Sequence, residues 1–368
     1  MEIHEIYMRR ALKLAEGGWG KTNPNPFVGS VIVKDGEIIA EGFHEILGCA
    51  HAEIAAMNNA TKDVAGGTLY VNLEPCSHFG RTPPCAKAII EAGIKTVVVA
   101  MVDPNPQVSG KGIQLLRDAG LEVRVGVLEK EALKLNEIFI KYITKKKPFV
   151  IMKTAMTLDG KTATAEGDSK WVTGETARNY VHVIRNRVSA IMVGINTVLK
   201  DDPLLTTRLE AGIGRDPVRI IIDSTGRIPE DSKVLNKNSR TGVILATTSL
   251  LEKEKQLRLE NLGVRIIKAD GQNQRVDLEI LMEELYKLEI DSVLLEGGGT
   301  LNASAINAGI VDKVLCFIAP KILGGEKAIT PVEGEGFNTM EKAIKLKNIN
   351  TEKFGEDILI EAYIAGRS

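Results

Sequence analysis

The chain has 368 residues, of which 44% are hydrophobic and 26% charged, a composition typical of a packed globular protein with about two domains. Its formal net charge of −1 gives no general electrostatic attraction to nucleic acid or to a membrane surface. No apolar run approaches the roughly 18 residues of a membrane span, the charged N-terminus lacks a secretory core, and four cysteines make no disulfide framework, so we expect a cytoplasmic protein.

Helices and strands alternate through the first 142 residues. Residues 6–15 have helical periodicity, and an Asp-Gly turn predicts a hairpin between strands at 28–33 and 37–44. The alternation favours a layered α/β domain. The elements predicted further along are a helix at 51–60, a strand at 68–76, a helix at 85–93 ended by Gly93, a buried strand at 95–103, and a helix followed by a strand within 112–127.

A domain boundary is predicted in YITKKKPFV (142–150), because a lysine run followed by Pro148 is a poor helix and a good linker. The alternative is a solvated loop inside one domain. We divide the chain into domains at 1–145 and 146–368. The second domain resumes the α/β alternation, with strands predicted at 149–157, 190–195, 217–223, 242–248, 264–269, 291–297 and 313–320.

Two cysteines frame the loop EPCSHFGRTPPC (74–85), and His51 and Glu53 open the predicted helix upstream. Cys76 follows a strand and Cys85 opens the next helix, so both can meet His51 beyond the carboxyl end of one sheet. One imidazole and two thiolates are good zinc ligands, and they leave a fourth position for a water whose pKa zinc lowers toward neutrality. Glu53 is placed to move protons between that water and a leaving amine.

The pattern H-x-E followed by P-C and a second cysteine is the signature of zinc-dependent nucleobase deaminases. The usual form has two residues between its cysteines, whereas this sequence has eight. Two alternatives stay open: a pair of buried structural cysteines, or a disulfide. The remaining cysteines, Cys49 and Cys316, have no partner motif, and we expect both to pack in the core.

The second half opens with a buried strand that carries Lys153, and a glycine-bearing loop leads on to Ser169 and Trp171. Arg185 and Arg187 follow on a predicted helix. These side chains are suited to binding an anion and an aromatic ring. The alternatives are that the arginines are solvated helix charges and that Trp171 belongs to the core.

Two further segments complete the second half. VGINTVLKDDP (193–203) is predicted as a strand followed by a polar turn. LLEGGGTLNASAINAG (294–309) is a strand, three glycines and a helix, a turn at which backbone amides can approach a phosphate. It is not G-x-G-x-x-G, so the Rossmann fingerprint is absent. We expect residues 225–290 to be scaffold.

The motifs HAE, PCSHFGRTPPC and TNPNPFVGSVIV together resemble the deaminase domain of the bifunctional riboflavin-biosynthesis deaminase–reductase family. The resemblance implies a cytidine-deaminase-like fold, zinc on His51, Cys76 and Cys85, and Glu53 as the proton shuttle. Amides and imidazoles would read the pyrimidine edge, although the Asn-Pro turn and loop ordering are alternative roles for some of them. The residues implied to lie near the substrate are Asn25, His44, His78, Arg81 (on a phosphate) and Asn105.

The second half resembles the reductase domain of the same family, so the resemblance covers nearly the whole chain. It implies a dihydrofolate-reductase-like fold that uses NADPH, with Arg185 and Arg208 as candidates for bidentate phosphate binding and with Lys153 or Asp201 assisting proton transfer to the ribose. The implied cofactor contacts are Ala155, Trp171, Thr197, Asp201, Ser224, Gly298, Gly299, Thr300, Leu301, Asn302, Ala303 and Ser304. The implied substrate contacts are Lys153, Ser169, Arg185, Leu205, Arg208 and Glu296.

The family implies hydrolytic deamination of 2,5-diamino-6-ribosylamino-4(3H)-pyrimidinone 5′-phosphate. Reduction of the ribosyl side chain with NADPH then gives 5-amino-6-ribitylamino-uracil 5′-phosphate. It also implies a homo-oligomer, with a small-molecule substrate and neither nucleic acid nor membrane as a partner. One alternative is a zinc deaminase of another nucleobase, nucleoside or tRNA adenosine with an accessory nucleotide-binding domain. The other is a non-catalytic zinc-stabilised nucleotide-binding protein.

Overall fold

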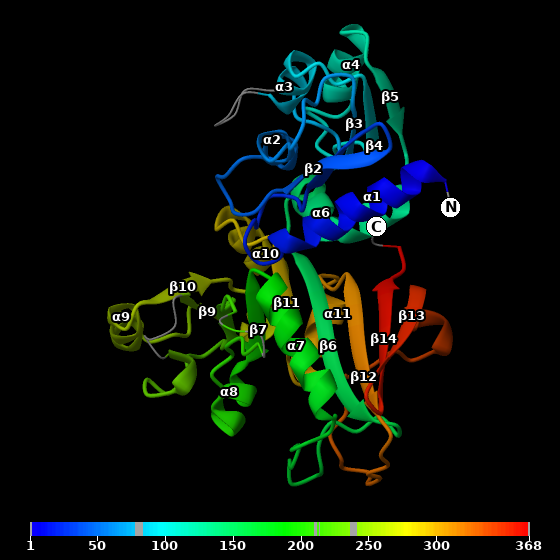
Figure 1. Cartoon of the computed structure of the whole chain (residues 1–368). Coiled ribbons are helices and arrows are strands. Elements are labelled where there is room, and N and C mark those ends of the chain that lie inside the picture. The colour runs from blue at the N-terminus through cyan, green and yellow to red at the C-terminus, as the bar shows by residue number, and fades with distance from the viewer. Residues whose placement is uncertain (1, 78–83, 210–211, 213, 236–240, 367–368) are drawn as a thin grey trace. The chain divides into compact units, whose positions relative to one another are not determined.

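A computed structural model of the chain describes residues 2–77, 84–209, 212, 214–235 and 241–366 (Figure 1). The chain forms two compact units, Met1–Lys146 and Lys147–Ser368, each built around its own sheet. Within the described residues, every helix is too short or too polar to span a bilayer.

The first unit contains a five-stranded mixed sheet in the order β2-β1-β3-β4-β5. The first strand pairs antiparallel with its neighbours on both sides, whereas β3, β4 and β5 are parallel. The hairpin turn places Asp35 and Gly36 at φ 52° and 79°, the left-handed region that the Asp-Gly pair favours. The strands are β1 (Gly29–Lys34), β2 (Glu37–Phe43), β3 (Thr68–Leu73), β4 (Thr96–Met101) and β5 (Glu122–Val125).

Helices cover both faces of this sheet, which gives three layers. Helices α1 and α5 pack on one face, and α2, α3 and α4 pack on the other. Since β3 and β4 are parallel, the segments that follow them leave the sheet at one edge, and the N-termini of α2 and α3 lie close to the first of these segments. The helices are α1 (Ile3–Ala15), η1 (Glu16–Gly18), α2 (Ala52–Asn58), α3 (Cys85–Glu91), α4 (Lys111–Asp118), α5 (Glu129–Leu135) and α6 (Glu137–Lys145).

The structure differs from the prediction that the whole segment 142–150 is a linker. Residues 142–145 are helical and belong to α6, so the link between the two units is confined to Lys146–Pro148. The helix forms because its apolar side chains are half-buried, with Ile140 packed against the core of the first unit. This packing stabilises the helix even though the lysine run is a poor helix by itself.

The second unit contains a nine-stranded sheet in the order β10-β9-β8-β7-β11-β6-β12-β14-β13. The seven strands from β10 to β12 run parallel, and they are the seven that the sequence predicts; β14 and β13 continue the sheet antiparallel. The strands are β6 (Phe149–Thr157), β7 (Ala190–Gly194), β8 (Val218–Ile222), β9 (Val243–Thr247), β10 (Val264–Lys268), β11 (Ser292–Leu295), β12 (Lys313–Ala319), β13 (Leu346–Phe354) and β14 (Asp357–Ile364).

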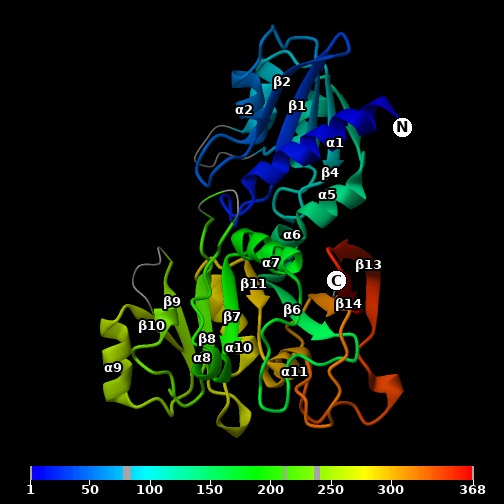
Figure 2. The same ribbon diagram turned by 60° about the horizontal axis from the view of Figure 1, so that its bottom comes forward.

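The parallel strands are apolar on both faces because helices cover both faces, as can be followed in Figure 2. Met192 points into the core under α10 and α11, and its neighbour Ile191 points into the core under α8 and α9. The helices are α7 (Glu175–Arg187), α8 (Ile195–Asp201), η2 (Lys233–Leu235), α9 (Lys253–Asn261), η3 (Gln272–Gln274), α10 (Leu278–Lys287), α11 (Gly299–Asn307) and η4 (Met340–Lys342).

The polar turn expected after β7 is instead the helix α8. Ile195 and Val198 lie three residues apart and bury in the same core cluster, which accounts for the helix. The segments that leave β7, β8 and β11 emerge at the carboxyl edge of the parallel sheet, the place where open α/β sheets bind ligands.

Candidate active sites

The first unit brings together the three predicted metal ligands. His51 Nδ1 lies 3.2 Å from Cys85 Sγ and 3.6 Å from Cys76 Sγ, and all three ligand atoms lie within 4.8 Å of one another. Tetrahedral zinc with the usual bond lengths separates such atoms by about 3.5–3.8 Å. The donor set and its spacing therefore fit zinc without rearrangement of the backbone.

Local structure explains why the three side chains converge. His51 is the N-cap of α2 and Cys85 is the first residue of α3, while Cys76 lies three residues beyond β3. The backbone N–H of Cys85 donates to Cys76 Sγ at 3.3 Å, which ties the two ends of the intervening loop together. Amides at a helix N-terminus favour the thiolate form of cysteine, the form that binds a metal.

The two sulfur atoms share a proton. The hydrogen bond from Cys85 lowers the pKa of Cys76 to about 4, and the Cys76 thiolate in turn raises the pKa of Cys85. The hydrogen bond to Cys76 also raises the pKa of His51. One thiolate is therefore already present at neutral pH, and the second proton would be released when a metal binds.

Glu53 lies in the first turn of α2 with only 3% of its surface exposed. Burial raises the pKa of its carboxyl to about 7, and a hydrogen bond with Cys85 places it beside the metal-ligand cluster. A carboxyl group that ionises near neutral pH can both accept and release a proton, which is what general acid–base catalysis requires. A structural metal site would have no need of it.

Two of the residues implied to bind substrate lie beside this cluster. Asn25 Nδ2 lies 3.3 Å from His44 Nε2, and the His44 ring stands edge-on to the ring of His51, with 5.7 Å between centroids. Burial lowers the pKa of His44, so its ring is neutral. His78 and Arg81 lie outside the described residues.

Asn105 lies in the loop after β4, where its Oδ1 accepts a hydrogen bond from the backbone N–H of Gln107. That loop is held by Glu74, a buried carboxylate two residues before Cys76. Glu74 accepts four backbone hydrogen bonds at 2.8–3.2 Å from residues 103, 110, 112 and 113. It thereby joins the cysteine segment to the Asn105 loop, a link that the sequence pattern did not indicate.

The expected core packing of the remaining cysteines is wrong for one of them. Cys49 is exposed in the turn before α2, where the chain runs over the surface. Cys316 is half-buried on β12, and burial raises the pKa of its thiol.

The second unit contains two adjoining cavities at the carboxyl edge of its sheet, of about 610 Å³ and 350 Å³. Residues after β7, β8 and β11 line the larger cavity, and β6, α7 and the segment around 208 line the smaller one. They share a wall made of Thr162, Ser169, Glu296 and the three glycines at 297–299.

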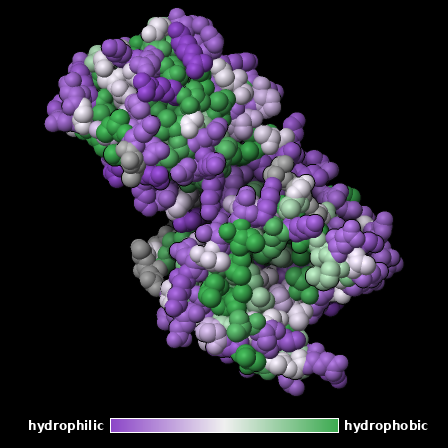
Figure 3. All heavy atoms as spheres, turned by 90° about the vertical axis from the view of Figure 1, so that its right-hand side faces the viewer, coloured by the Kyte–Doolittle hydropathy of each residue, from purple (hydrophilic) through white to green (hydrophobic). Residues whose placement is uncertain are grey.

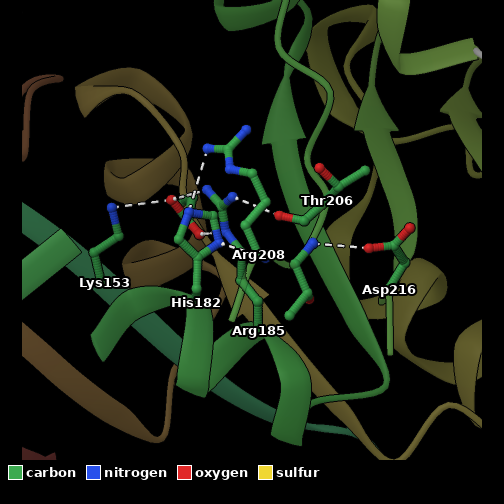
Figure 4. Close-up of polar contacts among 8 residues, drawn as sticks. Lys153, His182, Arg185, Thr206, Arg208 and Asp216 are labelled. Carbon is green, nitrogen blue, oxygen red and sulfur yellow. Dashed lines mark hydrogen bonds and ion pairs between the residues drawn. The ribbon is translucent and has the colours of Figure 1, made fainter. Parts of the chain in front are cut away.

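Glu296, at the end of β11, forms a buried ionic cluster with Arg185 and Lys153, which are labelled in Figure 4. Arg185 donates to both of its carboxylate oxygens, at 2.7 and 3.0 Å, and Lys153 Nζ lies 3.0 Å from one of them. Burial opposes ionisation of Glu296, but the charges of Arg185 and Lys153 outweigh it and lower the pKa of this carboxyl. The cluster holds the Lys153 ammonium group in place at the wall of the smaller cavity.

The predicted bidentate face of Arg185 is thus occupied by Glu296, and its remaining amino group donates to the carbonyl of Thr206 at 3.1 Å. Arg208 is the more exposed arginine of the pair, and its guanidinium lies 3.2 Å from His182 Nε2. Burial and the charges of Arg185 and Arg208 lower the pKa of His182 to about 4, so its ring is neutral and has one acceptor nitrogen; the backbone N–H of Arg208 donates to Nδ1 at 3.3 Å.

The glycine turn leads into the N-terminus of α11. A Cβ added at Gly298 would meet no atom within 4 Å, which leaves the backbone accessible from both cavities. At Gly299 a Cβ would collide with the side chain of Glu333 and with the carbonyl of Thr330. A nine-residue helix that begins at such a turn presents free amides to an anion, so the turn fits the diphosphate of a dinucleotide.

Trp171 is 63% exposed rather than part of the core. The guanidinium of Arg178 lies over its ring, 4.6 Å from the centroid, and both residues line the smaller cavity. The aromatic face is thus at the surface of the cavity, available to a flat ligand ring.

Most of the other residues predicted for this unit line one of the cavities. Leu205 is buried in the core under α8, and Ala303 is buried on α11; neither lines a cavity wall. The larger cavity is lined by Thr197, Asp201, Ser224, Thr300, Leu301 and Ser304, and the smaller by Lys153, Ala155, Trp171, Arg185, Arg208 and Asn302.

Sequence reasoning missed several residues of these cavities. Arg178 and His182 line the smaller cavity together with Arg185, at spacings of four and three on α7, a helical stripe that the sequence does contain. Arg227 and Arg275 line the larger cavity but belong to the region 225–290, which was expected to be scaffold. No local motif marks them.

Comparison with known proteins decides the family. Residues 1–101 match the cytidine and deoxycytidylate deaminase zinc-binding region, and residues 148–360 match the RibD C-terminal domain. The chain is 51% identical to the riboflavin biosynthesis protein RibD of Actinobacillus pleuropneumoniae, over 96% of this chain and 94% of that protein. It is 45% identical to RibD of Aquifex aeolicus, over 98% of both.

The chain belongs to the RibD family. Solved structures agree over the whole length. RibD of Acinetobacter baumannii superposes with a TM-score of 0.88 at 38% identity, covering 98% of this chain and 99% of that chain. A Thermotoga maritima protein described as a diaminohydroxyphosphoribosylaminopyrimidine deaminase/5-amino-6-(5-phosphoribosylamino)uracil reductase gives a TM-score of 0.87 at 43% identity, with the same coverage.

Membership of the RibD family confirms the predicted architecture and the class of activity. The chain is a bifunctional enzyme of riboflavin biosynthesis, with a cytidine-deaminase-like domain followed by a dihydrofolate-reductase-like RibD reductase domain. Zinc is the metal of the deaminase region and NADPH the reductant of the reductase domain. The non-catalytic alternative is therefore excluded.

Proposed function

We propose that this enzyme deaminates 2,5-diamino-6-ribosylamino-4(3H)-pyrimidinone 5′-phosphate and then reduces the ribosyl side chain of the product to ribityl. The reaction pair named for the Thermotoga maritima protein supports this choice of substrate. The observation that carries it is that one chain holds both a His51–Cys76–Cys85 cluster with buried Glu53 and a separate cavity around Lys153, Glu296 and Arg185.

The deaminase domain comprises residues 1–145 and the reductase domain residues 146–368 in this proposal. The division into compact units at 146/147 supports it, as does the start of the reductase-family match at residue 148. The linker Lys146–Pro148 lies between α6 and β6, where no element is interrupted.

In the deaminase site, His51, Cys76 and Cys85 hold zinc, and the spacing of their ligand atoms supports this assignment. Bound zinc supplies a water of lowered pKa and a positive charge near the reacting carbon. Glu53 takes a proton as water adds to C2 of the pyrimidine, and it returns that proton to the amino group, which leaves as ammonia. Its burial and its pKa of about 7 support this role.

Asn25 and His44 read the pyrimidine edge, a role supported by their contact with each other beside His51. His78, Arg81 and Asn105 complete the substrate contacts, with Arg81 on the phosphate. The neutral state of the His44 ring suits it to a heterocycle that offers both donors and acceptors.

In the reductase site, NADPH supplies a hydride to C1′ of the ring-opened ribosylamine, in which C1′ is joined to nitrogen by a double bond. Reduction needs one proton at that nitrogen. The Lys153 ammonium is the proton donor, because Glu296 holds it at the wall of the smaller cavity, whereas Asp201 lines only the larger one. Arg185 fixes Glu296 from its other side.

The sugar phosphate binds in the smaller cavity, with Arg208 on the phosphate and Ser169 beside the shared glycine wall. His182 positions Arg208 without adding a charge of its own. The cofactor would lie in the larger cavity and extend into the smaller one, where Ala155 and Trp171 would hold its nicotinamide end, and the turn from Gly298 to Ser304 would hold its diphosphate.

We also propose that the enzyme is a homo-oligomer. Figure 3 shows apolar side chains gathered on the face of the reductase domain that carries the β13–β14 edge. Leu346, Ile349 and Ile358 are exposed there, and an exposed edge strand invites pairing with a second copy. Light scattering of the purified protein tests this, and a monomer at micromolar concentration would contradict it.

The test of the substrate is a comparison of ammonia release from a panel of compounds by the zinc-loaded enzyme. We expect rapid release from the diaminopyrimidine ribosyl phosphate, and none above background from cytidine, dCMP or tRNA adenosine. Faster release from a nucleoside, a nucleotide or tRNA would overturn the proposal and favour another deaminase substrate.

A further inference from the structure

Two ligand-facing residues of the reductase domain lie on one short segment, residues 168–174, which precedes α7. Ser169 lines both cavities, and the ring of Trp171, which is largely exposed, lines the smaller one. Because the segment contains neither helix nor strand, no regular ladder of backbone hydrogen bonds fixes it. The place of the Trp171 ring therefore depends on individual contacts from other parts of the domain.

Hydrogen bonds anchor both ends of this segment. At its start, the N–H of Asp168 donates to Thr164 Oγ1 at 3.0 Å, and the carbonyl of Asp168 accepts from the N–H of Thr164 at 2.9 Å. At its end, the N–H of Gly174 donates to the carboxylate of Asp357 at 2.7 Å, and Asp357 is buried. The stretch that contains Trp171 lies between these two anchors.

Lys321 holds that stretch. Its ammonium group donates to the carbonyl of Trp171 at 2.7 Å and to the carbonyl of Val172 at 2.9 Å. Among the described residues, the backbone of these two has no other hydrogen bond, and no carboxylate lies within ion-pair distance of the ammonium group. Hydrogen bonds from a charged donor are roughly twice as strong as neutral ones. Lys321 is thus the one described polar restraint on the main chain that carries the tryptophan.

The main chain around Lys321 is itself fixed, so the ammonium group starts from a defined place. The N–H of Leu158, just beyond β6, donates to the carbonyl of Lys321 at 2.8 Å. The carboxylate of Asp159 accepts from the N–H groups of Leu323 and Gly324 at 3.1 and 2.7 Å. The turn after β6 therefore holds the loop after β12, and Lys321 connects both to the ligand-facing segment.

Lys321 can act on a ligand only through the tryptophan, because it is not among the described residues that line either cavity. A second cation contacts the ring itself. The guanidinium of Arg178 lies over the Trp171 ring, 4.6 Å from its centroid, and donates to the carbonyl of Thr173 at 2.6 Å. Arg178 thus covers one face of the ring, whereas Lys321 fixes the main chain from which the ring extends.

We propose that Lys321 is a positioning residue of the reductase reaction, which binds two consecutive carbonyls and so holds Trp171 where its ring can meet the nicotinamide end of the cofactor. This inference rests on the proposed function of the two cavities. Without the ammonium group the segment would sample several positions, and a ligand could bind only the fraction of molecules in which the ring is correctly placed. The effect would appear in the affinity for the ligand rather than in the chemical step.

The test compares Lys321→Met, which keeps the length of the side chain but not its donors, with Lys321→Arg, which keeps a charged donor. Lys327→Met is the matched control, because Lys327 is an exposed lysine close by in the sequence and is not among the described lining residues. All proteins are full-length and carry Trp19→Phe, so that Trp171 is the only tryptophan of the chain. Thermal unfolding verifies that each variant keeps its fold, as expected for substitutions at exposed positions.

The decay of fluorescence anisotropy of Trp171 in the ligand-free protein measures the nanosecond motion of the ring. We expect Lys321→Met to show a larger fast component than the parent protein, because the main chain at residues 171 and 172 has lost its restraint. Lys321→Arg and Lys327→Met should both resemble the parent protein. This measurement needs no ligand, so it is independent of what the cavities bind.

Binding of NADPH is then followed by the quenching of Trp171 fluorescence. The Kd for NADPH should rise about tenfold in Lys321→Met, which corresponds to a segment that is correctly placed in about a tenth of the molecules. The KM for NADPH should rise in parallel, while kcat stays within about threefold. Lys321→Arg should recover most of the affinity, and ammonia release by the deaminase domain should be the same in all variants.

Several results would overturn the inference. An unchanged anisotropy decay in Lys321→Met would do so even if NADPH bound more weakly, because Lys321 would then act through its charge. Increased motion with unchanged NADPH affinity would show that the position of the ring does not matter for binding. A lower kcat with unchanged KM would assign Lys321 to the chemical step. These three results leave the proposed cofactor placement intact, whereas failure of NADPH to quench Trp171 in the parent protein would refute that placement and the inference with it.

Discussion

The two sites of this enzyme are built in different ways. In the deaminase domain, the metal ligands and Glu53 come from two helix N-termini and one strand end, and their chemistry depends on three side chains in mutual contact. In the reductase domain, the ionic cluster and the glycine turn draw on β6, α7, β11 and α11, and the one carboxylate of the cluster is paired with two cations before any ligand binds. The first site is completed by a metal ion, the second by its own protein charges.

The largest effect that separates the two sites is expected from Glu53→Gln. The amide keeps the size of the side chain but cannot carry a proton, so ammonia release should fall by about 10³-fold. NADPH oxidation with the already deaminated substrate should not change, and the zinc content should stay at one per chain. Glu45→Gln, at an exposed residue of the same domain, is the control and should leave the rate of ammonia release unchanged. Retained deamination in Glu53→Gln would show that another group moves the proton.

The next largest effect is expected from Glu296→Gln, which leaves Lys153 and Arg185 without their shared counter-ion. Breaking a buried ionic cluster should destabilise the reductase domain by about 3 kcal/mol, measured by urea unfolding, and abolish NADPH oxidation. Ammonia release should persist. Glu284→Gln removes an exposed pair with Lys287 and should leave the urea unfolding midpoint close to that of the wild type.

The same cluster gives a dependence of stability on pH. Since Arg185 and Lys153 lower the pKa of Glu296 in the folded state, the unfolded chain takes up a proton at a higher pH than the folded chain does. This contribution to stability is complete above the unfolded value of about 4.3 and is lost as the pH falls below it. The wild type should therefore lose more stability than Glu296→Gln between pH 5 and 3, and parallel losses would contradict the account.

A smaller effect is expected from His182, which supports Arg208 without bearing charge. His182→Leu removes the acceptor and should raise the KM for the sugar phosphate by about tenfold, with kcat within about threefold. His182→Gln keeps an acceptor and should recover most of the loss. Because the pKa of His182 is about 4, KM should not change between pH 6 and 8 through this residue. A change in kcat alone would assign His182 to the chemical step instead.

The smallest effect concerns a position remote from both sites. Gly36 occupies the hairpin turn of the deaminase domain at φ 79°, and a Cβ added there would meet nothing within 4 Å. Gly36→Ala should cost about 1 kcal/mol of stability through backbone strain alone. Both activities should keep their wild-type rates at 25 °C, and loss of either would mean that the hairpin contributes to a site.

The contrast between the sites also explains what the sequence could predict. The seven parallel strands have continuous apolar runs, and the zinc ligands lie in a compact motif, so both could be identified from local patterns. The edge strand β13 could not, because it is polar and largely exposed. Helix α6 was missed because packing of residues such as Ile140 outweighed its lysine-rich end.

The parts of the reductase site that escaped prediction are those assembled by tertiary structure. Arg227 and Arg275 lie 48 positions apart in sequence, and only the order of β8, β9 and β10 brings them to one cavity. The pairing of Arg185 with Glu296 likewise joins α7 to β11. The guanidinium group of Arg185 therefore binds a carboxylate, whereas the sequence analysis predicted a phosphate as its partner. Charge and spacing identified these residues as polar, but only the fold determines their partners.

The most direct test of two separate sites in one chain is a single time course with the diaminopyrimidine ribosyl phosphate. Ammonia is followed first with zinc-loaded enzyme alone, and NADPH oxidation is followed after NADPH is added. We predict that one equivalent of ammonia per substrate is released before NADPH is present. One equivalent of NADPH should then be oxidised for each ammonia released. NADPH oxidation without prior ammonia release, or neither signal from folded zinc-loaded protein, would contradict the account.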